Sequence, residues 1–234
     1  MPRYVVSADI GQLHDFTAIS VCEVWNRQAA WEHVLAHPDE HPPMLTLDPA
    51  IDFDAKGSGA LVDSGGCARL NVRHMERLRQ QSYPQIIRRI AELMRKPPLG
   101  NATLLIDATG VGRPVLDMAR AAGLWCTGMT ITSGRDEAHH PADYRDWLVP
   151  KRLLIQTVDM LLHRDALKVA PTLAEAENLV YELNDFRYRI DPETGYESCS
   201  ARSSEHDDMV LSIAMACWHA TQPERGDVWT TYVV

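Results

Sequence analysis

TLLIDATGVGRPVLDMARAAG, residues 103–123, is the stretch that decides the fold class of this chain. It opens with a short apolar run, places Asp107 at the end of that run, and continues through a Gly-x-Gly turn. Pro114 suits the first turn of a helix, and Gly123 suits its end. A buried strand followed by a loop and a helix is the repeating unit of parallel sheets, so the stretch predicts an α/β protein.

The segment before this unit predicts antiparallel strands. Residues 3–11, 16–26 and 29–37 are rich in β-branched and aromatic side chains and are separated by polar turns, which is typical of a three-stranded meander. Residues 70–78 are a possible further strand. Apolar residues at helical spacing across 83–96 predict an amphipathic helix.

The segment after the unit predicts further strands and helices. Together with the meander, these elements predict a mixed central sheet, with three antiparallel strands followed by parallel strands, flanked by helices. The elements are a buried strand at 125–133, a polar loop at 133–147, helices at 151–164 and 171–186, a hairpin turning at 191–195, and a last helix from near Glu205.

Length and composition indicate one soluble globular domain. The chain has 234 residues, of which 45% are hydrophobic and 24% charged, and this suits a single domain with a sizeable core. We assign the domain to residues 1–222, with a loop insertion at 38–66 and a C-terminal tail at 223–234. No apolar run reaches the roughly 18 residues of a membrane span, and the N-terminus does not resemble a secretory signal. These features predict a cytoplasmic protein without membrane contact.

The charge distribution is more informative than the net charge of −9. Residues 69–96 carry eight Lys or Arg against two Glu, and such a segment can follow the phosphate backbone of a nucleic acid. A solvated helix face is the alternative interpretation of the same pattern. The residues predicted to contact DNA are Arg73, Arg77, Arg79, Arg88 and Arg89.

Acidic side chains fall at the ends of the predicted strands. Strand alternation places Val5, Ser7 and Asp9 on one face, so Asp9 interrupts an otherwise apolar stretch. Asp107 ends a buried parallel strand, and the carboxyl ends of such strands are where α/β sheets bind ligands. A third acid lies in SSEHDDMVLS, which begins at Ser203.

Carboxylates that converge on one site repel each other, and a hard divalent cation with oxygen ligands is the usual way to hold them ionised. Two Mg²⁺ or Mn²⁺ ions about 4 Å apart would then act on a phosphodiester, as in a nuclease. Asp207 lies in a Ser-x-x-Asp capping arrangement with Ser204. Asp208, about 100° further round the helix, is therefore the predicted ligand, with Asp207 as a helper and His206 as an auxiliary residue.

Several motifs in this order resemble the nuclease domain of phage terminase large subunits. They are DIGQLHDFTAIS, LLIDATGVGRPVLD, VPKRLLI, the stretch from Glu182 to Phe186, and EHDDMVLSIAMACW. The resemblance covers nearly the whole chain. It implies an RNase H-like fold and two-metal cleavage of concatemeric double-stranded DNA, with little sequence preference, in a bacterial host cell.

The resemblance also assigns roles to particular residues. It makes Asp9 the first-strand ligand, Asp107 the fourth-strand ligand and Asp208 the last-helix ligand, and Asp15 and Lys151 match recurrent positions. The chain departs from a complete terminase because it has no Gly-x-x-x-x-Gly-Lys-Ser/Thr phosphate loop. We therefore expect either a nuclease domain expressed alone or a separate gene product that works with a packaging ATPase in another chain, and a small terminase subunit or portal is a further expected partner.

Three other interpretations remain open at this point. A Holliday-junction resolvase of the same fold would use the same acids, but it would require a dimer. A catalytically silent packaging or assembly module would bind no metal. The Asp-Ile-Gly and Asp-Ala-Thr-Gly-Val-Gly turns also resemble those of the actin and sugar-kinase superfamily, although such enzymes pair two lobes and 234 residues leave room for one.

Overall fold

The computed structural model describes residues 2–11, 15–26, 67–134, 136–190, 197–201 and 207–222. Within these ranges the chain forms one eight-stranded sheet in the order β6-β7-β5-β4-β1-β2-β3-β8, and β9 pairs with β10 in a separate ribbon. The strands are β1 Arg3–Asp9, β2 Phe16–Asn26, β3 Cys67–Arg79, β4 Thr103–Asp107, β5 Cys126–Thr132, β6 Ala138–His140, β7 Asp143–Pro150, β8 Leu167–Val169, β9 Phe186–Ile190 and β10 Glu197–Ala201. The helices are α2 Tyr83–Met94, the short 3₁₀ helix η1 Leu99–Asn101, α3 Gly112–Ala121, α4 Lys151–His163, α5 Ala176–Asp185 and α6 Asp208–Thr221.

The strand directions confirm the predicted mixed sheet. β1, β2 and β3 are antiparallel neighbours, whereas β4 runs parallel to β1, β5 parallel to β4, and β7 parallel to β5. The prediction of the third meander strand was wrong, because β3 at 67–79 pairs with β2. Residues 29–37, which were predicted to take that place, lie outside the described ranges, as do the 38–66 insertion and the 223–234 tail.

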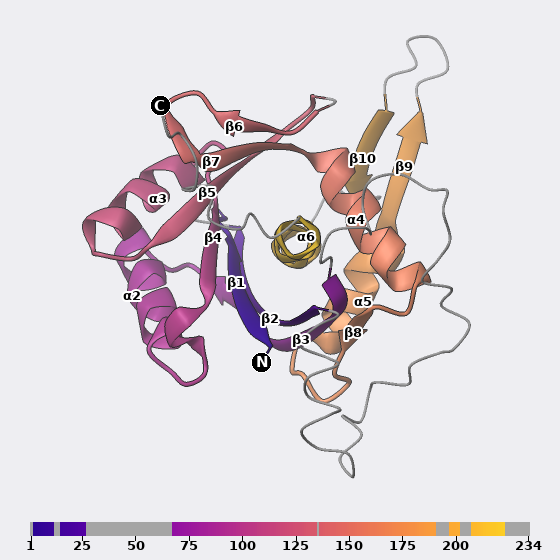
Figure 1. Cartoon of the computed structure of the whole chain (residues 1–234), viewed down its shortest axis with the longest axis horizontal. Helices are drawn as coiled ribbons and strands as arrows, with labels where there is room; N and C mark the ends of the chain where they lie inside the picture. The colour runs from indigo at the N-terminus through magenta and orange to yellow at the C-terminus, as the bar shows by residue number, and fades with distance from the viewer. Residues whose placement is uncertain are drawn as a thin grey trace, which may run out of the picture.

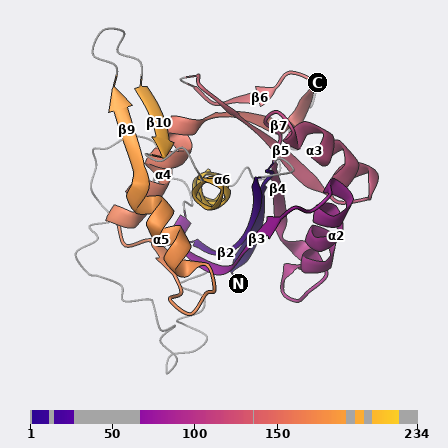
Figure 2. The same cartoon turned by 180° about the vertical axis from the view of Figure 1, so that it is seen from behind.

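The sheet curves around α6, which lies at its centre (Figures 1 and 2). α2 and α3 cover the outer face, and α4 and α5 lie on the inner side together with α6. Every residue of α6 from Met209 to Trp218 is buried. The last helix was predicted to begin near Glu205. The helix instead begins at Asp208 and is buried on all sides, because the sheet wraps around it.

Two other predictions of local structure were also wrong. The stretch 133–147, predicted as a polar loop, contains β6 and most of β7, which pair as antiparallel strands. The helix predicted at 171–186 ends at Asp185, and Phe186 begins β9. β6 is the edge strand of the large sheet, and a strand with one solvated face gives a weak hydrophobic signal.

The amphipathic helix at 83–96 is confirmed as α2. Ser82 and Gln85 form a capping box at its start, which satisfies backbone N–H groups that have no partner inside the helix. Ile86, Ile90 and Leu93 are buried against the outer face of the sheet. None of the described helices is both long and apolar enough to cross a membrane.

Candidate functional site

The carboxyl ends of β1 and β4 bring two aspartates together. Ala8 pairs with Ile106 in the parallel register, so the next residues, Asp9 and Asp107, lie side by side at the same edge of the sheet. Val5 and Leu105 belong to the inner core, and strand alternation therefore turns both aspartates toward α6. Both are buried, with 6% and 7% of their surface exposed.

Two glycines let the backbone close tightly around these acids. A Cβ atom on Gly11 would lie 2.1 Å from the carbonyl oxygen of Phe16, and one on Gly112 would lie 1.9 Å from that of Asp107. No larger residue fits at either position without moving the backbone. Gly11 of the Asp-Ile-Gly turn and Gly112 of the Gly-Val-Gly turn thus allow close backbone packing next to the acids.

α6 runs alongside β1 in the opposite direction, and this places its first turn at the acid end of the sheet. The guanidinium of Arg3, at the start of β1, donates to the carbonyl oxygen of Ala220 near the end of α6 (3.0 Å). In the middle, the hydroxyl of Ser7 lies 2.7 Å from the carbonyl oxygen of Ser212. Asp208 lies one turn before Ser212, so it faces the end of β1.

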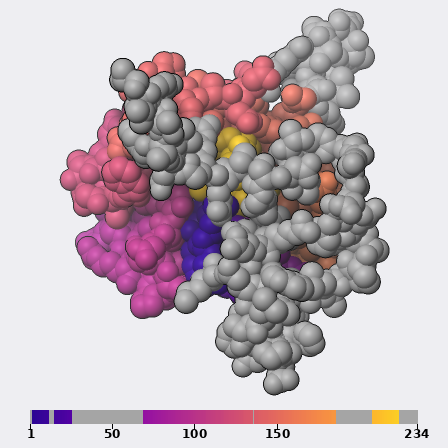
Figure 3. Space-filling view, in the orientation of Figure 1, coloured from indigo at the N-terminus to yellow at the C-terminus, as the bar shows by residue number. Residues whose placement is uncertain are grey.

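A buried cluster of three serines fixes this alignment. The hydroxyl of Ser212 donates to the backbone oxygen of Ser7 (3.1 Å) and lies 2.9 Å from the Ser20 hydroxyl. The Ser7 and Ser20 hydroxyls are 2.8 Å apart, and all three residues are fully buried. Because buried polar groups are costly to leave without partners, the cluster disfavours any sliding of α6 along β1. In the space-filling view, α6 residues lie directly beside the first strands (Figure 3).

Asp207 has a different role from the one expected. It is the N-cap of α6, yet its side chain makes no capping hydrogen bond. Its carboxylate instead accepts a hydrogen bond from the Nζ of Lys151 at the start of α4 (2.5 Å). The predicted capping arrangement would place Asp207 inside the helix, whereas Asp207 is the N-cap residue; Ser204 lies outside the described residues.

The electrostatics of the site disfavour ionised acids. Burial is the main cause that raises the pKa of Asp9 well above its ordinary value, and the nearby charges of Asp107 and Asp208 raise it further. Burial also raises the pKa of Asp107, although hydrogen bonds from Thr109 and the charge of Lys151 oppose the shift. The Thr109 N–H donates to the Asp107 carboxylate at 2.8 Å. Among the described residues, no arginine pairs with Asp9 or Asp107.

Glu182 and Arg77 complete this end of the molecule. Glu182 of α5 is 5% exposed, and burial raises its pKa to about 7, with Asp208 contributing in the same direction. Arg77 lies in the cross-strand row Asp9–Ala18–Arg77. Glu182 opens one of the motifs that resemble terminase nucleases but was assigned no role, although a glutamate between Leu179 and Leu183 in an apolar stripe is a detectable signal of a buried acid.

The remaining auxiliary residues are less closely connected to the acids. Asp15 is exposed just before β2, and its backbone lies against Gly11. Lys151 is brought to the site through Asp207. His206 lies outside the described residues.

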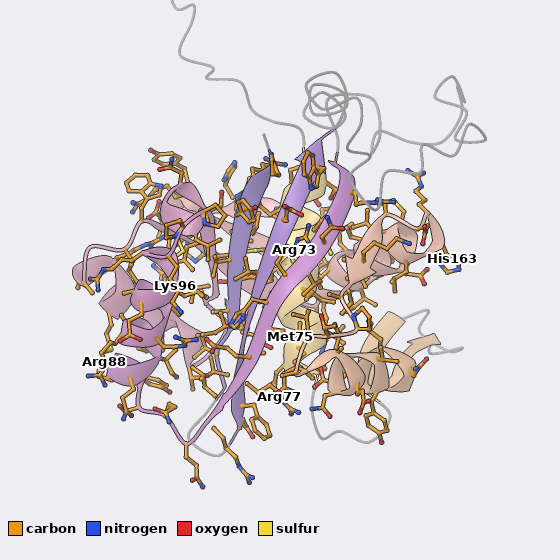
Figure 4. All side chains as sticks on the ribbon, turned by 90° about the horizontal axis from the view of Figure 1, so that it is seen from below. Arg73, Met75, Arg77, Arg88, Lys96 and His163 are labelled. Atoms are coloured by element: carbon orange, nitrogen blue, oxygen red, sulfur yellow. The ribbon has the colours of Figure 1, made fainter. Side chains whose placement is uncertain are left out.

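The basic residues of the segment 69–96 do not form one surface. Arg77 faces α5, where its guanidinium lies 4.0 Å from the Glu182 carboxylate. Arg89 of α2 lies on the opposite face of the sheet, paired with Glu76 at 2.8 Å. Among the other predicted DNA contacts, Arg73 is paired with Glu23 at 2.6 Å, and Arg79 and Arg88 are exposed. Arg73 and Arg77 lie along β3, whereas Arg88 lies on α2 (Figure 4).

The donor chemistry of the site fits a hard divalent cation. Carboxylate oxygens are the ligands that Mg²⁺ and Mn²⁺ prefer, and a cation would offset the mutual repulsion of Asp9, Asp107 and Asp208. The coordination geometry is not preformed: within the described ranges, no three Asp, Glu, His or Cys side chains are grouped tightly enough to hold a metal ion. Closing a ligand set around an ion therefore requires side-chain movement.

The mixed sheet with aspartates at adjacent parallel strand ends has an RNase H-like α/β fold. The large terminase nuclease from thermophilic phage G20c with bound magnesium matches with a TM-score of 0.57 and 19% identity, over 93% of this chain and 81% of that one. A second crystal structure of that nuclease gives 0.56 and 19%, over 92% and 81%. The Thermus phage P74-26 large terminase nuclease domain gives 0.52 and 20%, over 92% and 78%. The chain therefore has the fold of large terminase nuclease domains. No protein-family model matches the sequence, and no curated protein does.

Proposed function

We propose that the chain is a metal-dependent endonuclease that cleaves double-stranded DNA, with concatemeric phage DNA during genome packaging as its substrate. The observation that carries the proposal is the convergence of Asp9, Asp107 and the first turn of α6 in a buried setting that raises the pKa of both strand-end acids. Acids whose pKa is strongly perturbed by burial and by nearby charges are typical of functional sites. The shared fold with terminase nucleases supports the same interpretation.

Asp9, Asp107 and Asp208 are the proposed ligands of divalent metal, Mg²⁺ or Mn²⁺, with Asp207 nearby. Two such ions, when bound, supply an activated water and stabilise the leaving 3′ oxygen of a phosphodiester. The chain itself orients Asp107 through the Thr109 N–H and holds Asp207 through Lys151. Asp9 and Asp107 must both be deprotonated to act as ligands, so activity is expected to rise with pH.

The proposed partners follow from the net charge of −9. An acidic protein has weak, salt-sensitive affinity for DNA, and a motor that holds the substrate raises its local concentration. We propose a packaging ATPase as this partner, with a small terminase subunit or portal in the same assembly. Cleavage is expected to show little base preference, because the proposed contacts are to the DNA backbone.

Digestion of supercoiled plasmid with Mn²⁺, Mg²⁺ or EDTA tests the proposal. The native chain and an Asp117→Asn control, which changes an exposed acid of α3, are expected to nick DNA with metal and not with EDTA. Asp208→Asn is expected to be inactive. A native chain that shows no metal-dependent nicking would indicate a silent assembly module, and a strong preference for four-way junctions would indicate a resolvase.

A further inference from the structure

The first turn of α6 is capped by a residue from another helix. One carboxylate oxygen of Glu182, Oε2, accepts hydrogen bonds from the backbone N–H groups of Met209 and Val210, at 3.1 and 3.2 Å. These groups lie in the first turn of α6 and have no acceptor inside the helix. A side-chain oxygen at the N-cap position usually fills this role, but the N-cap residue Asp207 binds Lys151 instead.

The second oxygen of Glu182 faces a positive charge. Oε1 lies 4.0 Å from the guanidinium of Arg77, which is itself largely buried. Arg77 is held in turn by the ring of Phe16, 3.9 Å from the guanidinium carbon. Glu182 therefore connects the start of α6 to β3, in the same cross-strand row as Asp9.

These contacts distinguish a supporting role from a direct one. Oε2 of Glu182 is directed at two backbone N–H donors of α6, whereas Oε1 has no hydrogen-bond partner among the described residues and lies 4.0 Å from the Arg77 guanidinium. A cation placed beside Arg77 would also be repelled by it. The contacts of Oε2 thus connect Glu182 to the site through the first turn of α6.

We propose that Glu182 is a positioning residue that caps α6 from α5 and thereby sets the orientation of Asp208 toward Asp9 and Asp107. The proposal rests on the proposed metal-dependent nuclease function. The serine cluster prevents sliding at the second turn, and Glu182 fixes the first turn, where the ligand lies. Loss of a partner that orients a ligand typically costs tenfold to a hundredfold in metal affinity or activity.

Three variants of the full chain test this role. Glu182→Gln keeps an oxygen that accepts from the α6 N–H groups, Glu182→Ala removes it, and Glu177→Ala changes an exposed acid of the same helix. Mn²⁺ binding is measured by electron paramagnetic resonance without DNA, plasmid nicking is measured across a Mn²⁺ titration, and thermal unfolding gives the folded fraction. Hydrogen exchange reports on the backbone amides of Met209 and Val210.

Glu182→Gln and Glu177→Ala are expected to stay within about threefold of the native chain in Mn²⁺ affinity. Glu182→Ala is expected to lose about tenfold to a hundredfold, and the two amides are expected to exchange faster. A Gln variant as impaired as the Ala variant would show that the charge itself matters and would overturn the capping role. An Ala variant that matches the native chain would also overturn it.

Two further outcomes keep the test decisive. If Glu182→Ala does not fold, Glu182→Asp replaces it, because the shorter acid keeps the charge but does not reach the α6 N–H groups. Impairment of the Asp variant with retention in the Gln variant supports capping, and the reverse pattern contradicts it. If the native chain neither binds Mn²⁺ nor cuts DNA while the exchange pattern holds, the proposed nuclease function fails and Glu182 remains only a helix cap.

Discussion

Two buried acidic sites in the same sheet have opposite electrostatic surroundings. Asp146 of β7 is 1% exposed and is surrounded by donors: the Arg120 guanidinium, the Arg113 guanidinium at 3.3 Å and the Gly128 N–H at 2.7 Å. Asp9 of β1 is nearly as buried, but no described arginine contacts it. Its neighbours are other acids, which raise its pKa.

This difference in surroundings indicates that the Asp9 site, and not the Asp146 site, is the one expected to bind a cation from solution. Burying a carboxylate without a positive partner is costly, and around Asp146 the chain offsets this cost with its own arginines. At Asp9 and Asp107 it does not, although Arg77 lies only two strands away. Sites where buried carboxylates lower the stability of the fold in this way are typically functional.

The largest expected effect separates the two groups by activity. Asp9→Asn is expected to reduce metal-dependent nicking by more than about a hundredfold, because loss of a direct ligand should exceed the cost of losing an outer partner. Asp146→Asn is expected to leave the rate per folded molecule close to native. Nicking rates corrected for the folded fraction measure both effects. Equal losses in the two variants would remove the distinction between the groups.

The second expected effect is on stability, where the substitution at Asp146 is expected to cost more than the substitution at Asp9. Asp146→Asn is expected to destabilise the protein by about 3 kcal/mol, because it leaves the Arg120 charge without its buried partner. Urea unfolding followed by circular dichroism measures this change. The exposed Asp117→Asn serves as the control, with an expected change within about 0.5 kcal/mol. A change at Asp146 as small as that of the control would mean that its arginines are not needed for stability.

Asp9→Asn is expected to raise the stability of the metal-free protein by a smaller amount. The folded state holds the Asp9 proton more tightly than the unfolded state, so stability falls as pH rises from about 4 toward the raised pKa. Asparagine at position 9 does not titrate, so the variant avoids this loss of stability. A gain of about 1 kcal/mol in the free energy of unfolding corresponds to an increase of roughly 2–4 °C in the thermal midpoint. Midpoints in EDTA between pH 5 and 9 test the sign. An equal pH slope in both proteins would contradict the raised pKa.

The smallest expected effect concerns the basic residues. Arg88 is exposed on α2, whereas Arg89 is paired with Glu76. If Arg88 contacts a phosphate, Arg88→Ala should lower the slope of log affinity against log salt by about 1, and Arg89→Ala should change it less. Titrations of labelled duplex DNA at several salt concentrations measure both slopes. An unchanged slope for Arg88→Ala would favour the solvated helix face.

Patterns within single elements were predictable because they depend on neighbours in the sequence. Strand alternation correctly placed Asp9 with Val5 and Ser7, and helical spacing correctly gave α2. Errors arose where pairing is remote: the third strand of the meander is 41 residues downstream of the end of β2, at Cys67 after Asn26. No local pattern specifies which distant strand will pair.

The same distinction between local patterns and remote contacts applies to the candidate site. The residue types and their order determined by themselves that Asp9, Asp107 and Asp208 are candidates for metal chemistry, because carboxylates at strand ends and helix starts are visible in the sequence. Only the tertiary structure decided that α6 is wrapped by the sheet, that Glu182 caps it, and that the basic segment is split between two faces. These features depend on contacts between elements far apart in the chain, and their free energy is gained only when the whole fold forms.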